Sequence, residues 1–280
     1  MIYLNRGWKA QLVRSAFLVV SCSAGASLYA DLVIQSPIGF GWTGPYIGGY
    51  VGGAWDTSDL QTSVGSAVNP YFSESSDIAS VSQSGINSTN SNSAIAGIEL
   101  GDDFAISRRA TLGFVMDYGS FHLNQSQAAN NLSYPSDTGS YSLAHSIGTN
   151  WLYTVRGRFA FTPSTLWPLM LYATGGLAVT NVKVSTTFSD TSSLSGEGES
   201  SSSSNQLGWI LGAGVEVPLI QHLTLNAEYL YVDLGTVDDN SSIQNSAGGF
   251  GNEAGSLTSP LETSVKLHAS LFKLGLDYKF

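Results

Sequence analysis

The end of the chain, residues 265–280, alternates between two kinds of side chain and closes on an aromatic residue. One parity is apolar and aromatic: Phe272, Leu274, Leu276, Tyr278 and Phe280. The other parity is mostly small or charged: Leu271, Lys273, Gly275, Asp277 and Lys279. A period of two places successive side chains on opposite faces of a β-strand. This stretch is therefore predicted to be a strand with one apolar face and one polar face.

The first 30 residues have the pattern of a secretory signal peptide. Basic residues occur before Asp31 and acidic ones do not. A short apolar run, residues 16–20, precedes small residues and is too short to span a bilayer as a helix. Cleavage after Ala30 is favoured over cleavage after Ala26. The alternative is lipidation at Cys22, the only cysteine, so neither route leaves a pair for a disulfide.

The composition of the remaining chain excludes some classes of protein. Removal of residues 1–30 takes away three of the 11 basic residues and none of the 21 acidic ones, so the net charge becomes −13. Nucleic acid is a poor partner for such a surface. Charged residues are only 11% of the chain, against about 25% in soluble domains. With a mean hydropathy of +0.07, the chain is too polar for a bundle of membrane helices but suits a membrane barrel.

Eight stretches have the alternation of strands, and the connections between them alternate between long and short. We expect strands near residues 45–55, 94–104, 110–122, 147–161, 169–183, 207–217, 223–233 and 265–280. The long connections are residues 56–93, 123–146, 184–206 and 234–264. This rhythm predicts an all-β fold, an eight-stranded antiparallel transmembrane β-barrel with four long extracellular loops and short periplasmic turns. Residues 31–44 are then a periplasmic linker and residues 45–280 the outer-membrane barrel.

The polar face of the predicted strands indicates which side meets lipid. In the stretch 207–217 that face carries Gly212 and Gly214, opposite Trp209 and Leu211. A soluble, lipocalin-like barrel would also alternate, but its water-facing side would be covered with charged residues. Small residues with isolated charges instead suit the inside of a narrow barrel. The apolar face is therefore expected to contact outer-membrane lipid.

The isolated charges on the small-residue face are predicted to meet inside the barrel. A charge shielded from bulk water must be paired or hydrogen-bonded, and eight strands leave an interior just wide enough for side chains. The hypothesis is an ion-pair network that plugs the lumen; the alternative is that some charges lie in small wet pockets near the ends. The predicted network consists of Glu99, Asp117, Arg156, Arg158, Glu216, Glu228, Lys273 and Asp277.

Several motifs resemble one family. The segments 41–49, 171–178, 208–216 and 274–280 are similar to the entry, fifth, sixth and last strands of the opacity-like surface antigens, which have the OmpA-type barrel. The resemblance implies a Gram-negative outer-membrane location. It also implies that the barrel assembly machinery reads the carboxyl-terminal signal, Tyr278 and Phe280. Members of the family are described as surface antigens, adhesins, haem-binding proteins or porins.

The expected function is a structural and surface-antigen role, with acidic, Ser- and Asn-rich loops that contact host or environmental ligands. The alternative is a small-solute porin or a haem-binding receptor. His122 and His145 bracket the second long loop and are candidates for a haem site at the rim, or else are exposed histidines. Metal-ligand spacing and a catalytic triad are not evident. No cofactor and no enzymatic activity are expected.

Overall fold

The computed structural model describes residues 41–280, except 69, 137, 164–167, 193–194 and 246–256. The predicted signal peptide, residues 1–30, and most of the predicted linker, residues 31–44, lie outside the described residues. Within the described ranges, no helix is long and apolar enough to cross a membrane.

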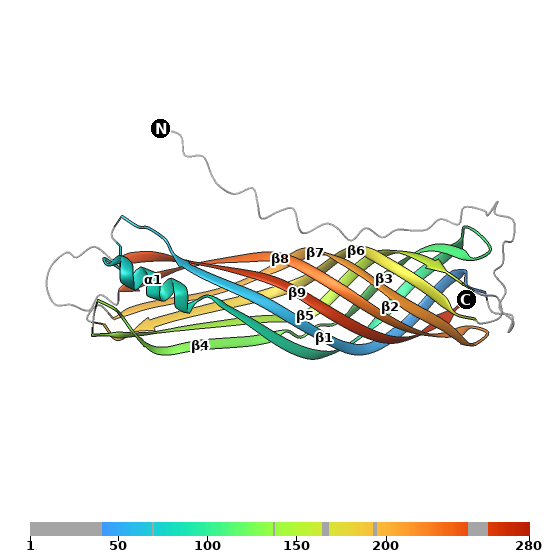
Figure 1. Ribbon diagram of the computed structural model, residues 1–280, viewed down its shortest axis with the longest axis horizontal. Helices are drawn as coiled ribbons and strands as arrows, with labels where there is room; N and C mark the ends of the chain where they lie inside the picture. Colours follow the sequence, from blue (N-terminus) through green and yellow to red (C-terminus); the bar gives the residue numbers. More distant parts are fainter. Residues whose placement is uncertain (1–40, 69, 137, 164–167, 193–194, 246–256) are drawn as a thin grey trace, which may run out of the picture. The chain divides into compact units, whose positions relative to one another are not determined.

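One antiparallel sheet curves round and closes on itself (Figure 1). Its elements are β1 (Gly44–Val64), α1 (Ser75–Ser84), β2 (Asn87–Ala105), β3 (Ala110–Ser120), β4 (Asn124–Ser133), β5 (Ser140–Phe161), β6 (Met170–Asp190), β7 (Gly196–Ile220), β8 (Leu223–Asn245) and β9 (Thr258–Lys279). The order is β3-β2-β1-β9-β8-β7-β6-β5, and pairing of β3 with β5 closes the ring. Because β3 and β4 pair with β5 one after the other, they share one position in the wall. The predicted eight-stranded barrel is confirmed.

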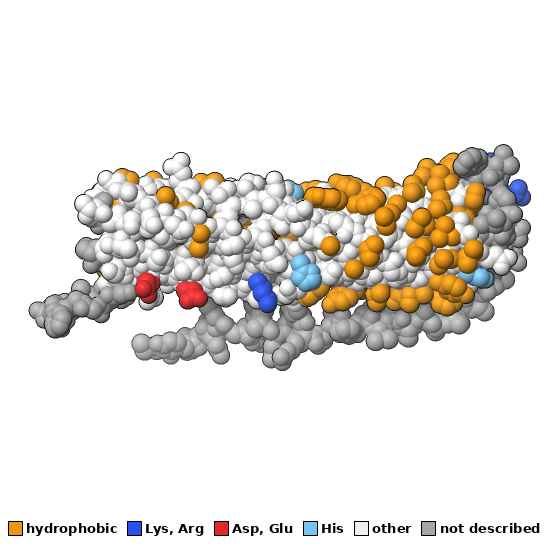
Figure 2. Space-filling view, turned by 90° about the horizontal axis from the view of Figure 1, so that it is seen from below, with side chains coloured by type: hydrophobic (Ala, Val, Ile, Leu, Met, Phe, Trp, Pro, Cys, Tyr) orange, Lys and Arg blue, Asp and Glu red, His pale blue; other side chains and the backbone are white. Residues whose placement is uncertain are grey.

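The strands are about twice as long as a membrane requires. β1 has 21 residues and β7 has 25, whereas a transmembrane strand needs about 9–11. Exposed large apolar side chains cover only one end of the long strands and end at or near aromatic residues such as Trp55, Tyr118 and Trp209. Figure 2 shows these side chains concentrated on one half of the barrel surface and sparse on the other. The apolar half is the membrane-spanning half, and the other is called the outer half below.

The apolar face changes sides where the strands leave the lipid. On β6, Leu171 and Leu177 point outward in the membrane-spanning half, while Thr174 points inward. Further along the same strand, Val182 and Val184 point inward and are 1% exposed. The backbone alternation continues unchanged, because side chains of a strand always alternate. Only the polarity of the two faces is exchanged, since lipid surrounds one half and water the other.

The predicted loops are largely strand, which corrects the boundaries expected from sequence. Much of 56–93, 123–146, 184–206 and 234–264 extends the neighbouring strands, and the connections shrink to 65–86, 134–139, 191–195 and 246–257. The strand extensions are rich in Ser, Thr and Asn. They therefore lack the outward apolar residues that mark strands in the membrane-spanning half. Their inward residues still alternate and fill the barrel, which supplies the packing that fixes them as strands.

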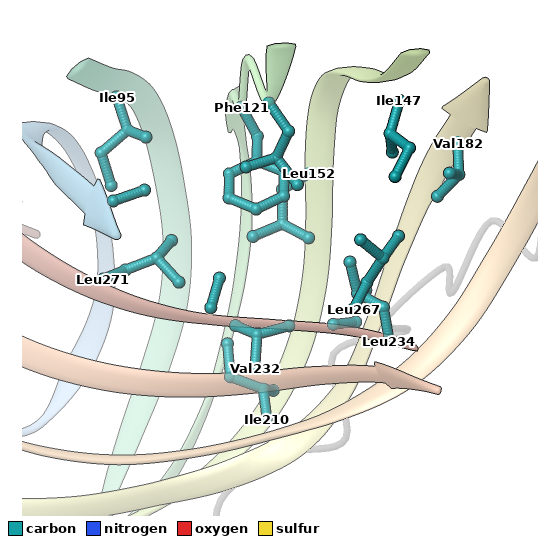
Figure 3. Close-up of a cluster of buried hydrophobic side chains, with 14 of the residues drawn as sticks. Ile95, Phe121, Ile147, Leu152, Val182, Ile210, Val232, Leu234, Leu267 and Leu271 are labelled. Atoms are coloured by element: carbon teal, nitrogen blue, oxygen red, sulfur yellow. The ribbon is translucent and has the colours of Figure 1, made fainter. Parts of the chain in front are cut away.

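An apolar layer fills the lumen from the upper part of the membrane-spanning half into the outer half. Its buried side chains come from nearly every wall strand and point toward one another (Figure 3). Phe121, Leu230 and Val232 are 0% exposed. A fully buried side chain of this size contributes about 1.5–3 kcal/mol relative to an exposed one. This layer closes the lumen between the membrane-spanning half and the outer mouth.

Candidate functional site in the lumen and at the outer mouth

The lumen of the membrane-spanning half contains a network of ion pairs centred on Arg156. This side chain extends from β5 and donates to Asp117 of β3 at 2.7 Å and to Glu228 of β8 at 2.6 Å. Lys273 of β9 lies 3.0 Å from Asp117, and Thr154 donates to the same carboxylate at 2.7 Å. Four strands are thereby connected through buried charges. Low polarity around them makes each pair strong but makes a missing partner costly.

A second cluster lies nearer the periplasmic end and is centred on Arg158. Its guanidinium pairs with Glu216, lies 3.8 Å from Asp103 and stacks 4.0 Å from the ring centroid of Tyr172. Lys279 bridges the same two carboxylates, at 3.0 Å from Asp103 and 3.3 Å from Glu216. Two cations and two anions therefore form a closed group, as their mutual burial requires.

Glu99 and Asp277 are held differently from the other predicted network residues. The amide of Asn226 donates to Glu99 at 3.0 Å and to Asp277 at 2.7 Å. Among the described residues, no Lys or Arg makes an ion pair with either carboxyl group. The structure thus places all eight predicted residues inside the barrel, six of them in ion pairs and two around one amide.

Sequence reasoning missed Asp103, Lys279 and Asn226 as members of this network. The strand alternation indicated Asp103 and Lys279, because Asp103 has the parity of Glu99 on β2 and Lys279 that of Asp277 on β9, and it placed Asn226 on the face of Glu228. Asp103 and Lys279 are near strand ends, where a charge is ordinarily solvated. Here Trp42 and Met170 close the periplasmic end and are 1% and 0% exposed, so the terminal charges are buried as well.

Glycines on the inner face of the wall make room for large rings from neighbouring strands. A Cβ at Gly97 would lie 2.5 Å from the hydroxyl oxygen of Tyr50, and one at Gly119 would lie 2.3 Å from it. The ring of Tyr50 on β1 therefore lies over Gly97 of the neighbouring β2 and reaches Gly119 of β3, and Lys273 Nζ of β9 lies 4.1 Å from its centroid. The space beside these small residues is filled by aromatic rings, so it does not form a channel.

The two histidines predicted to share a rim site do not meet. His122 is exposed, while its neighbours Phe121 and Leu123 are buried inside the wall, so His122 points outward. His145 points inward and is 6% exposed, with Nδ1 3.1 Å from Thr186 and Nε2 3.5 Å from Thr62. The predicted second loop is mainly strand, which places His122 part-way along the wall, so the two histidines do not form one site at the rim. In the described residues no group of three His, Cys, Asp or Glu side chains is arranged to hold a metal.

The position of His145 predicts a pH dependence of the outer half. Burial lowers its pKa to about 4, and the nearby Asp239 carboxylate opposes this only in part. The unfolded chain binds this proton near pH 6.5, so stability should fall as the pH drops from about 6.5 to 4. Amide exchange of residues 140–149 across this range measures the effect. His145→Gln should remove it, and an unchanged acid response would contradict the assignment.

Asp56 responds in the opposite sense and serves as the internal control. Burial raises its pKa to about 6, although a hydrogen bond from Gln125 acts against the shift. The stability from this group is present below the unfolded pKa of about 4 and is lost as the pH rises through about 6. Asp56→Asn should therefore change the neutral side of the profile and leave the acid loss from His145 in place.

The outer mouth is covered by the β1–β2 connection. Residues Tyr71 and Phe72, which precede α1, insert among Tyr134, Tyr141 and Phe188 at the outer end of the lumen. The Tyr71 hydroxyl donates to Asp190 at 2.5 Å, and Tyr71 N–H donates to Ser259 at 2.9 Å. We call Tyr71, Phe72 and α1 the cap. It joins the connections of three hairpins and closes the lumen at this end.

Removal of the Tyr71 hydroxyl is expected to loosen the cap without unfolding the barrel. Tyr71→Phe keeps the ring in its aromatic cluster and leaves Asp190 with one fewer donor, at a cost of about 1–3 kcal/mol. Proteolytic cleavage between residues 65 and 86 should become several-fold faster. Tyr231→Phe, on the outside of β8, is the matched control; equal cleavage rates in the two variants would refute the role of this hydrogen bond.

The predicted assembly signal lies at the periplasmic end of β9. Tyr278 stacks on His222 with centroids 5.6 Å apart and meets Phe280 edge to face at 5.3 Å. Phe280 is 72% exposed, and its N–H donates to Pro45 O at 3.1 Å. The last aromatic ring is therefore accessible on the outside of the wall, next to the first residues of β1.

These features define a class of protein. A closed ring with a lipid-width apolar belt outside and paired charges inside is a transmembrane β-barrel. A family model described as outer membrane protein beta-barrel domain matches residues 16–280, and the chain belongs to this family. The predicted family resemblance and the outer-membrane location in Gram-negative bacteria are thereby confirmed.

Individual relatives are similar along different lengths. The 31 kDa outer-membrane immunogenic protein of Brucella melitensis is 28% identical over 278 residues, covering 94% of this chain and 97% of the relative. The 22 kDa outer membrane protein of Rhizobium leguminosarum is 35% identical over 88 residues, covering 31% and 35% respectively. The outer membrane protein OprG of Pseudomonas aeruginosa is 12% identical, with coverages of 85% and 97% and a TM-score of 0.36.

Proposed function

We propose that this protein is a closed, non-catalytic surface barrel that holds a stiff polar cylinder outside the outer membrane and presents it for contact with host or environmental ligands. The observation that carries the proposal is the exchange of polarity along each strand. The outer half continues the ladders of the membrane half, as in β1 and β9, which stay paired from Tyr46 to Val64. Strands of this length bring the contact surface well beyond lipid headgroups.

A filled lumen supports a structural role over a porin. Three layers occupy it: the ion pairs around Arg156 and Arg158, the apolar layer, and the aromatic cluster under the cap. Each would have to be displaced for a solute to pass. The ionic layer also joins strands that are distant in sequence, so it doubles as a stabilising element of the wall.

The exposed charges of the outer half support a role in surface contact. Glu74, Glu197, Glu199, Asp238 and Glu262 are exposed there, with Lys183 and Lys266 as exposed cations. An acidic surface attracts partners with positive potential, and this attraction weakens as the salt concentration rises. We also propose that the barrel assembly machinery recognises Tyr278 and Phe280, because an exposed ring at the strand end is accessible before the barrel closes.

Two measurements test the function. Planar-bilayer recordings of the refolded protein should show no large, steady conductance. Sustained channel openings would contradict the closed barrel and favour the porin function. On intact cells, a cysteine-reactive label that does not cross the membrane should modify Ser201→Cys on the outer half. It should spare Arg108→Cys in the exposed β2–β3 turn, and the reverse labelling pattern would overturn the orientation.

A further inference from the structure

The outer half of the barrel has a seam between β2 and β4. β2 pairs with β3 only from Gly97 onward, so its residues 87–96 pair with β1 on one side and with no described strand on the other. β4 pairs with β5 and, within the described residues, with no other strand. In the outer half, the edges of β2 and β4 therefore face each other without pairing. In the membrane-spanning half, pairing of β2 with β3 closes the wall.

The hydrogen-bonding groups at the seam can be assigned from their neighbours. Thr149 N–H donates to Leu123 O, so odd-numbered residues of β4 up to Ala129 face β5 and even-numbered ones face the seam. On β2, Ala96 exchanges hydrogen bonds with the Ser120 hydroxyl, so even-numbered residues again face away from β1. The seam is thus lined by backbone N–H and C=O groups of Ser88, Asn90, Asn92, Ala94, Asn124, Ser126 and Ala128.

Side chains, not backbone, bridge the seam. The Gln125 amide reaches past β2 to donate to Asp56 and to Thr89 O, the latter at 3.3 Å, and Gln127 donates to the Thr89 hydroxyl. The Gln125 side chain is 6% exposed and points into the lumen, so the two strands are joined by inward side chains rather than by a backbone ladder. Among the described residues, the edges are held near each other without backbone hydrogen bonds of a ladder between them.

Neither edge has the usual protection against strand addition. Exposed edges are commonly blunted with Lys, Pro or inward charges, and residues 87–96 and 124–129 contain none of these. β7 and β8 also lose their ladder between Glu197 and Trp209, but they pair again at Gly196 and Asn245. That gap is closed at both ends and flanked by acids such as Glu199, so it differs from the seam.

We propose that the seam binds one extended segment of another polypeptide as an added strand. Both edges have backbone donors and acceptors without strand partners, and only another peptide backbone offers matching groups at the same repeat. A second copy of the barrel fits poorly, because the two edges face inward across a cleft rather than outward. The cleft leads to a cavity of about 270 Å³ lined by Leu60, Gln127, Leu143 and His145, so inward side chains of the segment should be small or apolar.

Binding requires the glutamine bridge to open. An inserted strand needs about 9.6 Å between β2 and β4, twice the spacing of paired strands. Gln125 would release Asp56 and Thr89 O, Gln127 would release the Thr89 hydroxyl, and the added backbone would enter between the two strands. The proposal rests on the proposed function in one respect, since the outer half must face the medium for a partner to reach it.

The test uses full-length refolded protein and a fluorescein-labelled peptide with the sequence of residues 87–96, which can pair with β4. Saturable binding by anisotropy is expected, with at least tenfold slower amide exchange at Ser126 and Ala128. Ala128→Pro removes a seam-facing N–H and keeps the β5 ladder, so binding should weaken at least tenfold. Ala128→Val keeps the N–H and should bind as the parent does. Heat-modifiable gel migration verifies that each variant is folded.

A second variant keeps the test decisive if the proline variant fails to fold. Gln127→Ala removes the hydrogen bond to Thr89 from one of the two bridging glutamines and should raise the association rate several-fold. Equal binding to the proline and valine variants, absence of protection at the seam, or self-association that excludes the peptide would each overturn the proposal. The labelling on cells involves no peptide, so failure of the seam and failure of the proposed function are seen separately.

Discussion

Replacing Arg156 with methionine is expected to destabilise the barrel by about 3–5 kcal/mol, the usual cost of removing one partner from a buried ion pair. Methionine fills a similar length but leaves Asp117 and Glu228 without their shared cation. Arg156 is 1% exposed, so water cannot replace the lost hydrogen bonds. The urea midpoint of the refolded protein, followed by tryptophan fluorescence and by heat-modifiable migration, measures the loss.

Two companion variants separate the network from a general effect of charge. Arg108 is exposed in the turn between β2 and β3, so Arg108→Met should leave the urea midpoint unchanged. Glu228→Gln should cost less than Arg156→Met, because Arg156 still has Asp117 as a partner. If all three variants unfold at the same urea concentration, the lumenal pairs contribute nothing to stability and the structural role assigned to them fails.

A charge in the middle of the lipid-facing belt should have the second large effect. Leu211 is 59% exposed and lies halfway along the apolar run of β7 between Leu207 and Val215. Leu211→Arg is expected to cost about 2–4 kcal/mol, the range for arginine on the lipid face at the bilayer midplane. Folding into vesicles, followed by gel migration against urea concentration, gives this value.

The matched control lies on the same face of the same strand. Ser201 also points outward from β7 and is exposed, but it lies in the outer half. Ser201→Arg should therefore change stability by less than about 0.5 kcal/mol, as surface substitutions usually do. A similar loss at both positions would mean that the belt does not end where the apolar residues end.

The membrane-spanning half could be predicted because lipid imposes a strong pattern on it. Outward positions such as Leu274 and Leu276 must be apolar, and a period of two then identifies both strand and face. The same parity is enough to assign Arg156 and Glu228 to the lumen. Which carboxylate each cation meets depends on strand order and on the stagger of the barrel, so those pairs required the three-dimensional fold.

The outer half has the sequence character of loops because water imposes a weaker pattern than lipid. Its outward positions accept Ser, Thr and Asn, which also dominate real loops. The inward residues, such as Val182 and Val184, continue the alternation, but their apolar parity is the reverse of that in the membrane half. A search for one constant apolar face therefore ends at the lipid boundary, and the inward alternation beyond it is overlooked.

The sequence by itself determined that these strands separate lipid from a crowded interior, because each residue in a strand must face one side or the other. The tertiary structure decided how far the strands continue, which charges meet, how Tyr71 and Phe72 close the mouth, and where β2 departs from its neighbour to leave Gln125 and Gln127 bridging the wall. These depend on contacts between residues far apart in the chain, and alternation along a single strand carries no information about them.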